Sequence, residues 1–297
     1  MPTAANDLAM TSSKLKLAPH HPRKAATHAS YDIHRYVGGA PASAEDVVAV
    51  EEPLEIRLLV EADKPRSVSI TMRTPGDDID LAAGFLFTEG ILSSSRAIES
   101  ITPEPDEANV VTVRLRASER VDLERLERHF YITSSCGVCG KSSLKHLRSR
   151  GLTGLAEDKM AVLPRVVHDL PETLRAAQTV FAQTGGLHGA GLFDAQGKLL
   201  SVHEDVGRHN AVDKVVGKAL QNGWIPLRDR ILMVSGRASF ELLQKALVAQ
   251  IPVLAAVGAP SSLAVDLAEE FQLTLIGFVR NDRFNVYAAP FRVKGLS

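Results

Sequence analysis

The first half of the chain carries apolar side chains at every second position in two neighbouring stretches. These stretches are residues 54–60 and 68–72, and a Lys64-Pro65 turn separates them. A period of two is typical of a strand that buries one face, because successive side chains of a strand point to opposite sides of the sheet. The pattern therefore predicts a β-hairpin.

A short helix and a further strand are predicted after this hairpin. Asp77 or Asp78 is placed to cap a helix that ends at Gly90, and residues 111–115 again alternate between apolar and polar side chains. Residues 123–130 have the apolar spacing of a helix that connects to the second half of the chain. Together these elements predict a small α+β unit.

In the second half of the chain, helix patterns and strand patterns alternate. A helix is expected to begin at Asp169, with Pro171 in its first turn, and to end at Gly185-Gly186. A second hairpin is expected over residues 190–203. The chain then alternates helix and strand over residues 212–220, 231–234, 240–249, 253–257, 263–271 and 273–279.

This order of elements, α-β-β-α-β-α-β-α-β, predicts an α/β fold with a mixed sheet. Strands that alternate with helices pair in parallel through right-handed crossovers. We expect a disordered polar tail over residues 1–30 and a smaller N-terminal α+β domain over residues 31–130. A CxxC loop and the α/β domain follow over residues 131–297.

The composition narrows the partners and the compartment that we expect. The 297 residues carry a net charge of −1, so no global field favours nucleic acid or a membrane surface. No apolar run approaches the roughly 18–20 residues of a spanning helix, and the first 30 residues lack the apolar core of a secretory signal. With 2 cysteines in the whole chain, these features favour a reducing cytoplasm.

The carboxyl ends of the three predicted parallel strands lie at one edge of the sheet, where open α/β sheets bind ligands. The turns at these ends are Ser235-Gly236-Arg237, residues 258–262 and Arg280-Asn281-Asp282-Arg283. Glycines permit close approach of the backbone, and arginines and helix N-termini favour phosphate oxygens. The pattern indicates a site for a nucleotide or another polyanion, with ordinary capping turns as the alternative. A P-loop is excluded because no GxxxxGK[ST] motif occurs.

Two polar clusters are expected beside this edge. Residues 203–210 bring an acid, a base, an amide and a guanidinium to a strand-to-helix junction, and His188 lies in the glycine-rich stretch 185–191. Glycine in such a turn indicates close approach of a ligand or of another backbone segment. His188 and His209 are therefore candidate site residues, and plain turn and capping chemistry is the alternative.

The two cysteines are separated by only two residues, in Cys136-Gly137-Val138-Cys139. A chain with so few cysteines is not held together by disulfides, so the pair is a candidate for chemistry. It could be half of a zinc site, although no second CxxC or H-x₃₋₅-H supplies the remaining ligands. It could also be a thioredoxin-like redox pair, although it precedes the α/β unit instead of opening a helix within it.

A third interpretation makes the CxxC pair a nucleophile that carries sulfur. A thiolate can accept a sulfur atom as a persulfide and pass it on. Gly137 and Gly140 are expected to let the segment move between a donor and an acceptor. Lys141 and neighbouring cations favour the thiolate form of cysteine. Two inert cysteines are the fourth alternative, but inert cysteines are usually buried among apolar side chains.

Several motifs resemble the formate dehydrogenase accessory sulfurtransferase family, FdhD, over about residues 45–288. The matching stretches are 72–75, 84–90, 134–141, 184–194, 204–214, 235–241 and 277–287. The resemblance implies a sulfurtransferase that accepts sulfur from a cysteine desulfurase. It implies that this sulfur passes to the bis-guanine-dinucleotide form of the molybdenum cofactor, a bound substrate, before the cofactor enters formate dehydrogenase.

The resemblance also implies roles for particular residues. The persulfide-bearing cysteine of the family matches Cys136, and Cys139 matches the second cysteine, which assists or relays. The cofactor-binding stretch of the family matches Phe278-Val279-Arg280-Asn281-Asp282-Arg283, which includes the third strand end described above. The resemblance also implies a homodimer that holds the cofactor at or near the surface shared by the two subunits.

The family's C-terminal unit is similar to the three-layer cytidine deaminase fold, and the predicted element order fits it. Zinc deaminases need H-x-E at one helix start and P-C-x-x-C at the next. Here His203 directly precedes Glu204, and residues 235–239 contain no cysteine, so no zinc is expected. Two other functions stay open: a non-catalytic cofactor chaperone that binds guanine nucleotides, and a zinc-binding interaction module.

Overall fold

The computed structural model describes residues 26–60, 64–116, 152, 154–157 and 159–296. Cys136, Cys139 and the helix expected over residues 123–130 lie outside this part of the chain. Within the described residues, no helix is long and apolar enough to cross a membrane.

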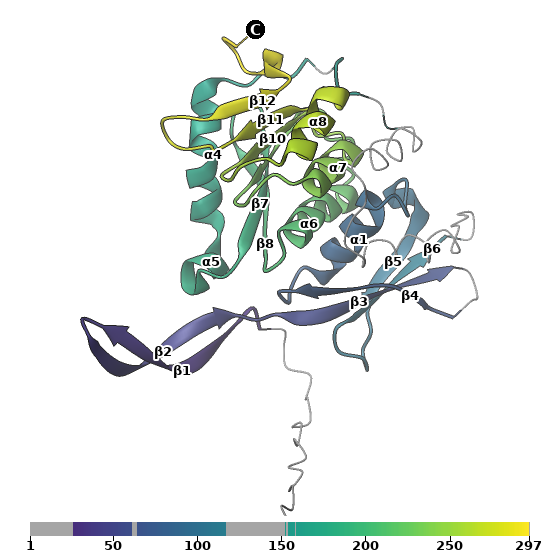
Figure 1. Ribbon diagram of the computed structural model, residues 1–297. Helices are drawn as coiled ribbons and strands as arrows, with labels where there is room; N and C mark the ends of the chain where they lie inside the picture. The colour runs from purple at the N-terminus through teal and green to yellow at the C-terminus, as the bar shows by residue number, and fades with distance from the viewer. Residues whose placement is uncertain (1–25, 61–63, 117–151, 153, 158, 297) are drawn as a thin grey trace, which may run out of the picture.

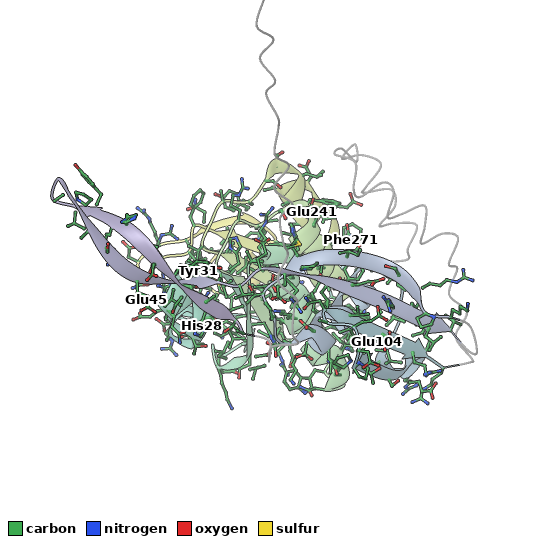
Figure 2. All side chains as sticks on the ribbon, turned by 90° about the horizontal axis from the view of Figure 1, so that it is seen from below. His28, Tyr31, Glu45, Glu104, Glu241 and Phe271 are labelled. Carbon is green, nitrogen blue, oxygen red and sulfur yellow. The ribbon has the colours of Figure 1, made fainter. Side chains whose placement is uncertain are left out.

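A two-stranded antiparallel hairpin extends from the body of the molecule (Figure 1). Its strands are β1 (His28–Val37) and β2 (Ala40–Ala49), so β1 begins inside the stretch that we expected to be a tail. Figure 2 labels Tyr31 and Glu45 on this hairpin, and both side chains are exposed. The sequence pattern missed it because most of its side chains are exposed on both faces and carry no alternation. The available signal was the Gly38-Gly39 turn, in which both residues have positive φ.

The hairpin predicted over residues 54–60 and 68–72 is confirmed. It forms part of a four-stranded sheet with the order β4-β3-β6-β5. Apolar side chains on one face of this sheet pack against α1 (Asp78–Thr88). The strand β5 was missed because its residues are mostly half-buried or exposed and do not alternate. A 3₁₀ turn, η1 (Ser95–Ala97), precedes it. The strands are β3 (Glu52–Val60), β4 (Arg66–Arg73), β5 (Ile98–Pro103) and β6 (Val110–Leu115).

The second sheet has six strands in the order β12-β11-β10-β9-β7-β8. The strands β9, β10 and β11 are parallel, whereas β7 runs antiparallel to β8 and β9, and β12 runs antiparallel to β11. The mixed sheet is thus confirmed, with β12 as an edge strand that the sequence did not predict. The strands are β7 (His188–Asp194), β8 (Leu199–Asp205), β9 (Arg230–Val234), β10 (Val253–Ala256), β11 (Thr274–Gly277) and β12 (Asn285–Ala288).

Helices cover both faces of this sheet and give a three-layer α/β arrangement (Figure 1). The predicted order of helices and strands in this half is confirmed, while a specific deaminase-like topology stays a prediction. A 3₁₀ turn, η2 (Pro290–Arg292), follows the last strand. One face carries α6 (Arg208–Gln221), α7 (Phe240–Val248) and α8 (Ser262–Phe271), and the other carries α4 (Pro164–Ala177) and α5 (Thr179–Thr184).

The helix expected to start at Asp169 was predicted wrongly. It begins at Pro164, its first-turn proline, and Pro171 lies inside it. The apolar face that includes Leu170 and Leu174 is buried against the sheet, and this burial outweighs the cost of an interior proline. The predicted helix is also interrupted at Gln178, where α4 ends and α5 begins. The second helix, α5, ends at Gly185, which has a positive φ, and the sequence predicted a helix end there.

The two sheets are joined through a backbone contact between α1 and α6. A Cβ atom on Gly84 would lie 1.8 Å from the carbonyl oxygen of Asp213, and one on Gly217 would lie 1.8 Å from that of Asp80. Each helix therefore needs a glycine where it meets the other. The close approach also lets Thr88 donate a 2.7 Å hydrogen bond to Asp213.

Alanine at either contact glycine tests this arrangement. We expect Gly84→Ala and Gly217→Ala each to lower the free energy of unfolding by about 2–3 kcal/mol, because the new methyl group forces the helices apart. Chemical denaturation with two-state fitting measures this change.

Gly154→Ala, outside the helices, is the control for a glycine away from the contact, because its Cβ atom would meet its nearest neighbour only at 3.5 Å. Alanine favours helix over glycine by about 1 kcal/mol. Unchanged or increased stability in both contact variants would therefore contradict a backbone-to-backbone contact.

Candidate functional site

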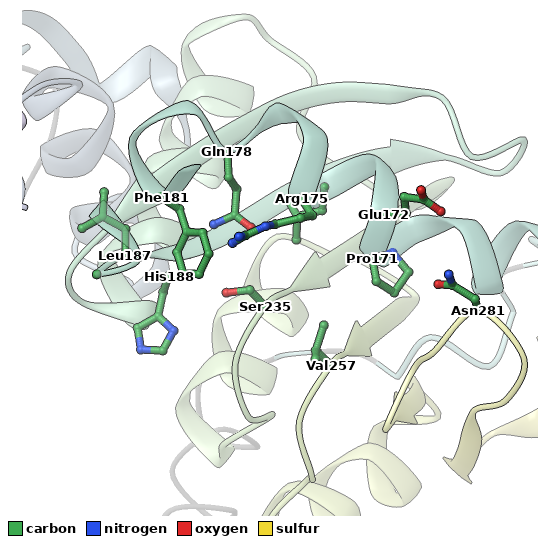
Figure 3. Close-up of a pocket in the computed structure, with 13 residues that line it drawn as sticks. Pro171, Glu172, Arg175, Gln178, Phe181, Leu187, His188, Ser235, Val257 and Asn281 are labelled. Atoms are coloured by element: carbon green, nitrogen blue, oxygen red, sulfur yellow. The ribbon is translucent and has the colours of Figure 1, made fainter. Parts of the chain in front are cut away.

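A cavity of about 720 Å³ opens at the carboxyl ends of β9, β10 and β11 (Figure 3). Ser235, Val257 and Asn281 line it from these three strand ends, and α4 and α5 form the opposite wall. His188 lines it as well, because the antiparallel strand β7 begins at the edge where β9 ends. The structure therefore places His188, Ser235 and Asn281 of the predicted site around one cavity.

The three strand-end turns are joined by backbone hydrogen bonds. The amide of Gly258 donates to the carbonyl oxygen of Gly236 at 2.9 Å, and the amide of Phe278 donates to that of Gly258 at 3.2 Å. A Cβ atom on Gly258 would lie 2.8 Å from the Gly236 oxygen, so this turn depends on glycine. The prediction that these turns meet at one edge is confirmed.

Arg280 fixes two of these turns to each other. Its guanidinium donates to the carbonyl oxygens of Val257 at 2.9 Å and Val279 at 2.7 Å, and its amide donates to the carbonyl oxygen of Arg283 at 2.8 Å. The side chain of Val279 is fully buried in the core, so this residue can offer a ligand only its backbone. The side chains of the remaining predicted residues of these turns are exposed at the edge: Arg237, Phe278, Asn281, Asp282 and Arg283.

His188 is half-buried at the start of β7. Burial lowers the pKa of its imidazole below the ordinary value of 6.5, and the nearby charges of Arg208 and His209 lower it further. The imidazole is therefore neutral near pH 7, so it can donate or accept a hydrogen bond without adding charge to the cavity.

His209 does not line the cavity. Its Nε2 atom lies 3.4 Å from the Ser239 hydroxyl and 3.8 Å from a Glu241 carboxylate oxygen, at the start of α7. This contact with His209 lowers the pKa of Glu241 to about 2. The structure thus places His209 between the starts of α6 and α7, beside the site.

The cluster expected over residues 203–210 splits into structural contacts. The Glu204 carboxylate accepts hydrogen bonds from the amides of Val180 at 2.9 Å and Phe181 at 2.7 Å, so it caps α5. The buried Asp205 carboxylate lies 2.8 Å from the Lys214 ammonium group. The alternative of a capped helix start with solvated charges does not describe this cluster, because α6 has no side-chain cap and Asp205 and Lys214 are buried. Glu204 acts on the site through α5.

A second cavity of about 320 Å³ lies between the two sheets, next to the first, and Leu187 lines both. There the Nδ1 atom of His203 lies 3.1 Å from an Asp77 carboxylate oxygen. This contact lowers the pKa of Asp77, whereas burial raises that of Asp80. The ligand atoms of His203, Asp77 and Asp80 lie within 4.8 Å of one another. The sequence predicted that the side chain of Asp77 or Asp78 caps α1. The structure shows no such hydrogen bond, and the Asp77 side chain contacts the second half of the chain instead.

The sequence missed the side chains that α4 and α5 contribute to the first cavity. The guanidinium of Arg175 stacks over the Phe181 ring at 3.7 Å, and Gln178 lies at the junction of the two helices. The sequence predicted one helix from Asp169 to Gly185-Gly186, but the chain breaks at Gln178 and Phe181 lines the cavity. No signal in the sequence marked this break.

Comparisons with known proteins agree with one another. The model of the FdhD/NarQ family matches residues 49–294. A protein of Streptomyces coelicolor named sulfur carrier protein FdhD is 52% identical over 88% of this chain and 94% of its own length. A protein of Sulfolobus acidocaldarius with the same name is 42% identical over 88% of this chain and 96% of its own length.

A solved structure shares the fold. A crystal structure of a provisionally assigned formate dehydrogenase accessory protein from Desulfotalea psychrophila superposes with a TM-score of 0.69 at 26% identity. The match covers 90% of this chain and all of that one.

The environment of His188 generates a prediction about its titration. We expect its imidazole to titrate with a midpoint below 6.5, because burial and nearby positive charge disfavour the protonated form. Two-dimensional NMR of the imidazole C–H groups across the pH range measures the midpoint, and His188→Gln assigns the signal. A midpoint at or above 6.5 would show that the imidazole is not desolvated as the structure places it.

Proposed function

The chain belongs to the FdhD/NarQ family, and we propose that it is a sulfur carrier that serves formate dehydrogenase. The family resemblance drawn from the sequence motifs is thereby confirmed. The observation that carries the proposal is the identity of about half of all positions with a protein named sulfur carrier protein FdhD, over 88% of this chain. The finer mechanism below is supported by the CxxC pair and by the strand-end cavity.

The first step loads sulfur onto Cys136. The thiolate of Cys136 attacks the outer sulfur of a persulfide on a cysteine desulfurase. The sulfur–sulfur bond of the donor breaks, a new one forms to Cys136, and the donor cysteine leaves as a thiolate. The step moves one neutral sulfur atom and needs no outside oxidant or reductant.

The second step releases sulfur to the molybdenum cofactor, the substrate. Once the cofactor is bound, the thiolate of Cys139 attacks the inner sulfur of the Cys136 persulfide, which forms a Cys136–Cys139 disulfide and releases hydrosulfide to the cofactor. The pair thus supplies the two electrons that turn neutral sulfur into a sulfide ligand. A dithiol reductant of the cytoplasm, where we expect the protein to act, then restores both thiols. This step gives the second cysteine of the pair a chemical role.

The strand-end cavity supports the binding of a guanine nucleotide end of the cofactor. Ligand cavities typically measure about 300–1,000 Å³, and this one measures about 720 Å³. Arg237 and Arg283 are exposed on the strand-end turns that border the cavity through Ser235 and Asn281, and they can pair with phosphate oxygens. Ser235, Gly236 and the turn over residues 278–283 offer backbone groups. A homodimer would present two copies of this cavity, which matches the two guanine nucleotides of the cofactor.

Sulfur loading separates this proposal from a cofactor chaperone that carries no sulfur. After incubation with a cysteine desulfurase and cysteine, we expect the intact mass of the protein to rise by one sulfur atom. The gain should disappear in Cys136→Ala and persist in Cys139→Ala, because only the first cysteine accepts the sulfur.

Binding of guanosine diphosphate is the control in the same samples. Cys136→Ala should bind it like the wild type, which shows that the variant is folded. Normal binding without any mass gain in the wild type would favour the chaperone instead. Bound zinc that stays after desalting and disappears in both cysteine variants would favour the zinc-binding module.

A further inference from the structure

We propose that Gln178 reads the base of the bound nucleotide and makes the cavity specific for purines with a 6-keto group. The inference rests on the proposed guanine nucleotide site and names the residue that would set its specificity. It starts from a buried amide nitrogen that has no hydrogen-bond partner among the residues that the structure describes.

The side chain of Gln178 is 3% exposed, yet it lines the strand-end cavity. Among the residues that the structure describes, its Nε2 atom has no hydrogen-bond partner. A buried amide group without a partner costs free energy, and in native proteins such groups are rare. A ligand that offers an acceptor to this group recovers that free energy, so the unused N–H groups indicate where a ligand contact is missing.

The position of Gln178 is fixed by its surroundings. It lies at the junction of α4 and α5. The Glu204 carboxylate accepts hydrogen bonds from the amides of Val180 at 2.9 Å and Phe181 at 2.7 Å in the first turn of α5. Its carboxamide packs against the backbone of Gly189, where a Cβ atom would lie 2.5 Å from the Gln178 Cδ atom. Glycine at position 189 therefore makes room for this side chain, and the carboxamide is held ready before any ligand binds.

The groups beside Gln178 suit a flat aromatic ligand. Figure 3 shows its carboxamide next to the Phe181 ring and the Arg175 guanidinium, which stacks over that ring at 3.7 Å. An aromatic ring and a stacked guanidinium offer surfaces for a purine. The exposed arginines lie at the strand-end turns, so the base would face α5 while the phosphates face Arg237 and Arg283.

Hydrogen-bond chemistry selects the kind of purine. The Gln178 carboxamide can donate to O6 of guanine and accept from its N1–H group. Adenine presents the reverse pattern, which a rotated carboxamide could also match. Arg175, however, carries only donors, so it can share O6 of a keto purine but repels the amino group of adenine. The pair therefore favours guanine and hypoxanthine over adenine.

Calorimetric titration of the full-length protein with three nucleotides tests this inference. We expect the wild type to bind guanosine and inosine diphosphates at least about tenfold more tightly than adenosine diphosphate. Gln178→Leu should weaken binding of both keto nucleotides by about tenfold and reduce the preference over adenosine diphosphate. Gln178→Met, which keeps the length of the side chain, should do the same if the leucine variant is unstable.

Gln183→Leu is the matched control, because Gln183 is an exposed glutamine of α5, the short helix that begins just after Gln178. It should leave all three affinities unchanged. If the wild type prefers the keto nucleotides and the Gln178 variants keep that preference, Gln178 does not read the base. The proposed function would still stand. Equal wild-type affinities for all three nucleotides would overturn the inference as well. If the wild type binds none of them, the nucleotide site of the proposed function fails and the inference fails with it.

Discussion

The structure depends on the backbone contact between α1 and α6 at Gly84 and Gly217. Because no side chain separates the two helices there, polar groups on both helices come within bonding distance of the opposite half of the chain. The ammonium group of the buried Lys245 lies 3.0 Å from Asp213 of α6 and 2.9 Å from Glu89, just after α1. Buried charges need such partners, so the contact and the charge pairs stabilise the same arrangement.

This arrangement extends to the cavity through β8 and α6. Lys214 of α6 lies 2.8 Å from Asp205 and donates to the backbone oxygen of Thr74 at 3.0 Å, which joins the first sheet to the end of β8. The neighbouring residue Glu204 then caps α5 and so holds Phe181 and Gln178 at the cavity. The first sheet therefore contributes to the shape of the site through these contacts.

The sequence predicted the elements that depend on local periodicity and missed those that depend on distant contacts. The strands and helices from β7 to β11 follow from their buried faces, and the meeting of the strand-end turns follows from the order of the elements. The break at Gln178 and the unused amide of its side chain depend on Gly189 and Glu204, which are distant in the sequence. The hairpin β1–β2 was missed because its strands bury little surface.

In the proposed function, the sulfur on Cys136 reaches a cofactor that is held by its guanine nucleotide in the strand-end cavity. Transfer of radioactive sulfur from the preloaded protein to unsulfurated molybdenum cofactor, in a single turnover, measures this directly. We expect the label to move to the cofactor. Excess guanosine diphosphate should suppress the transfer, while adenosine diphosphate should not. Label that stays on the protein, or transfer that guanosine diphosphate leaves unchanged, would contradict the proposed function.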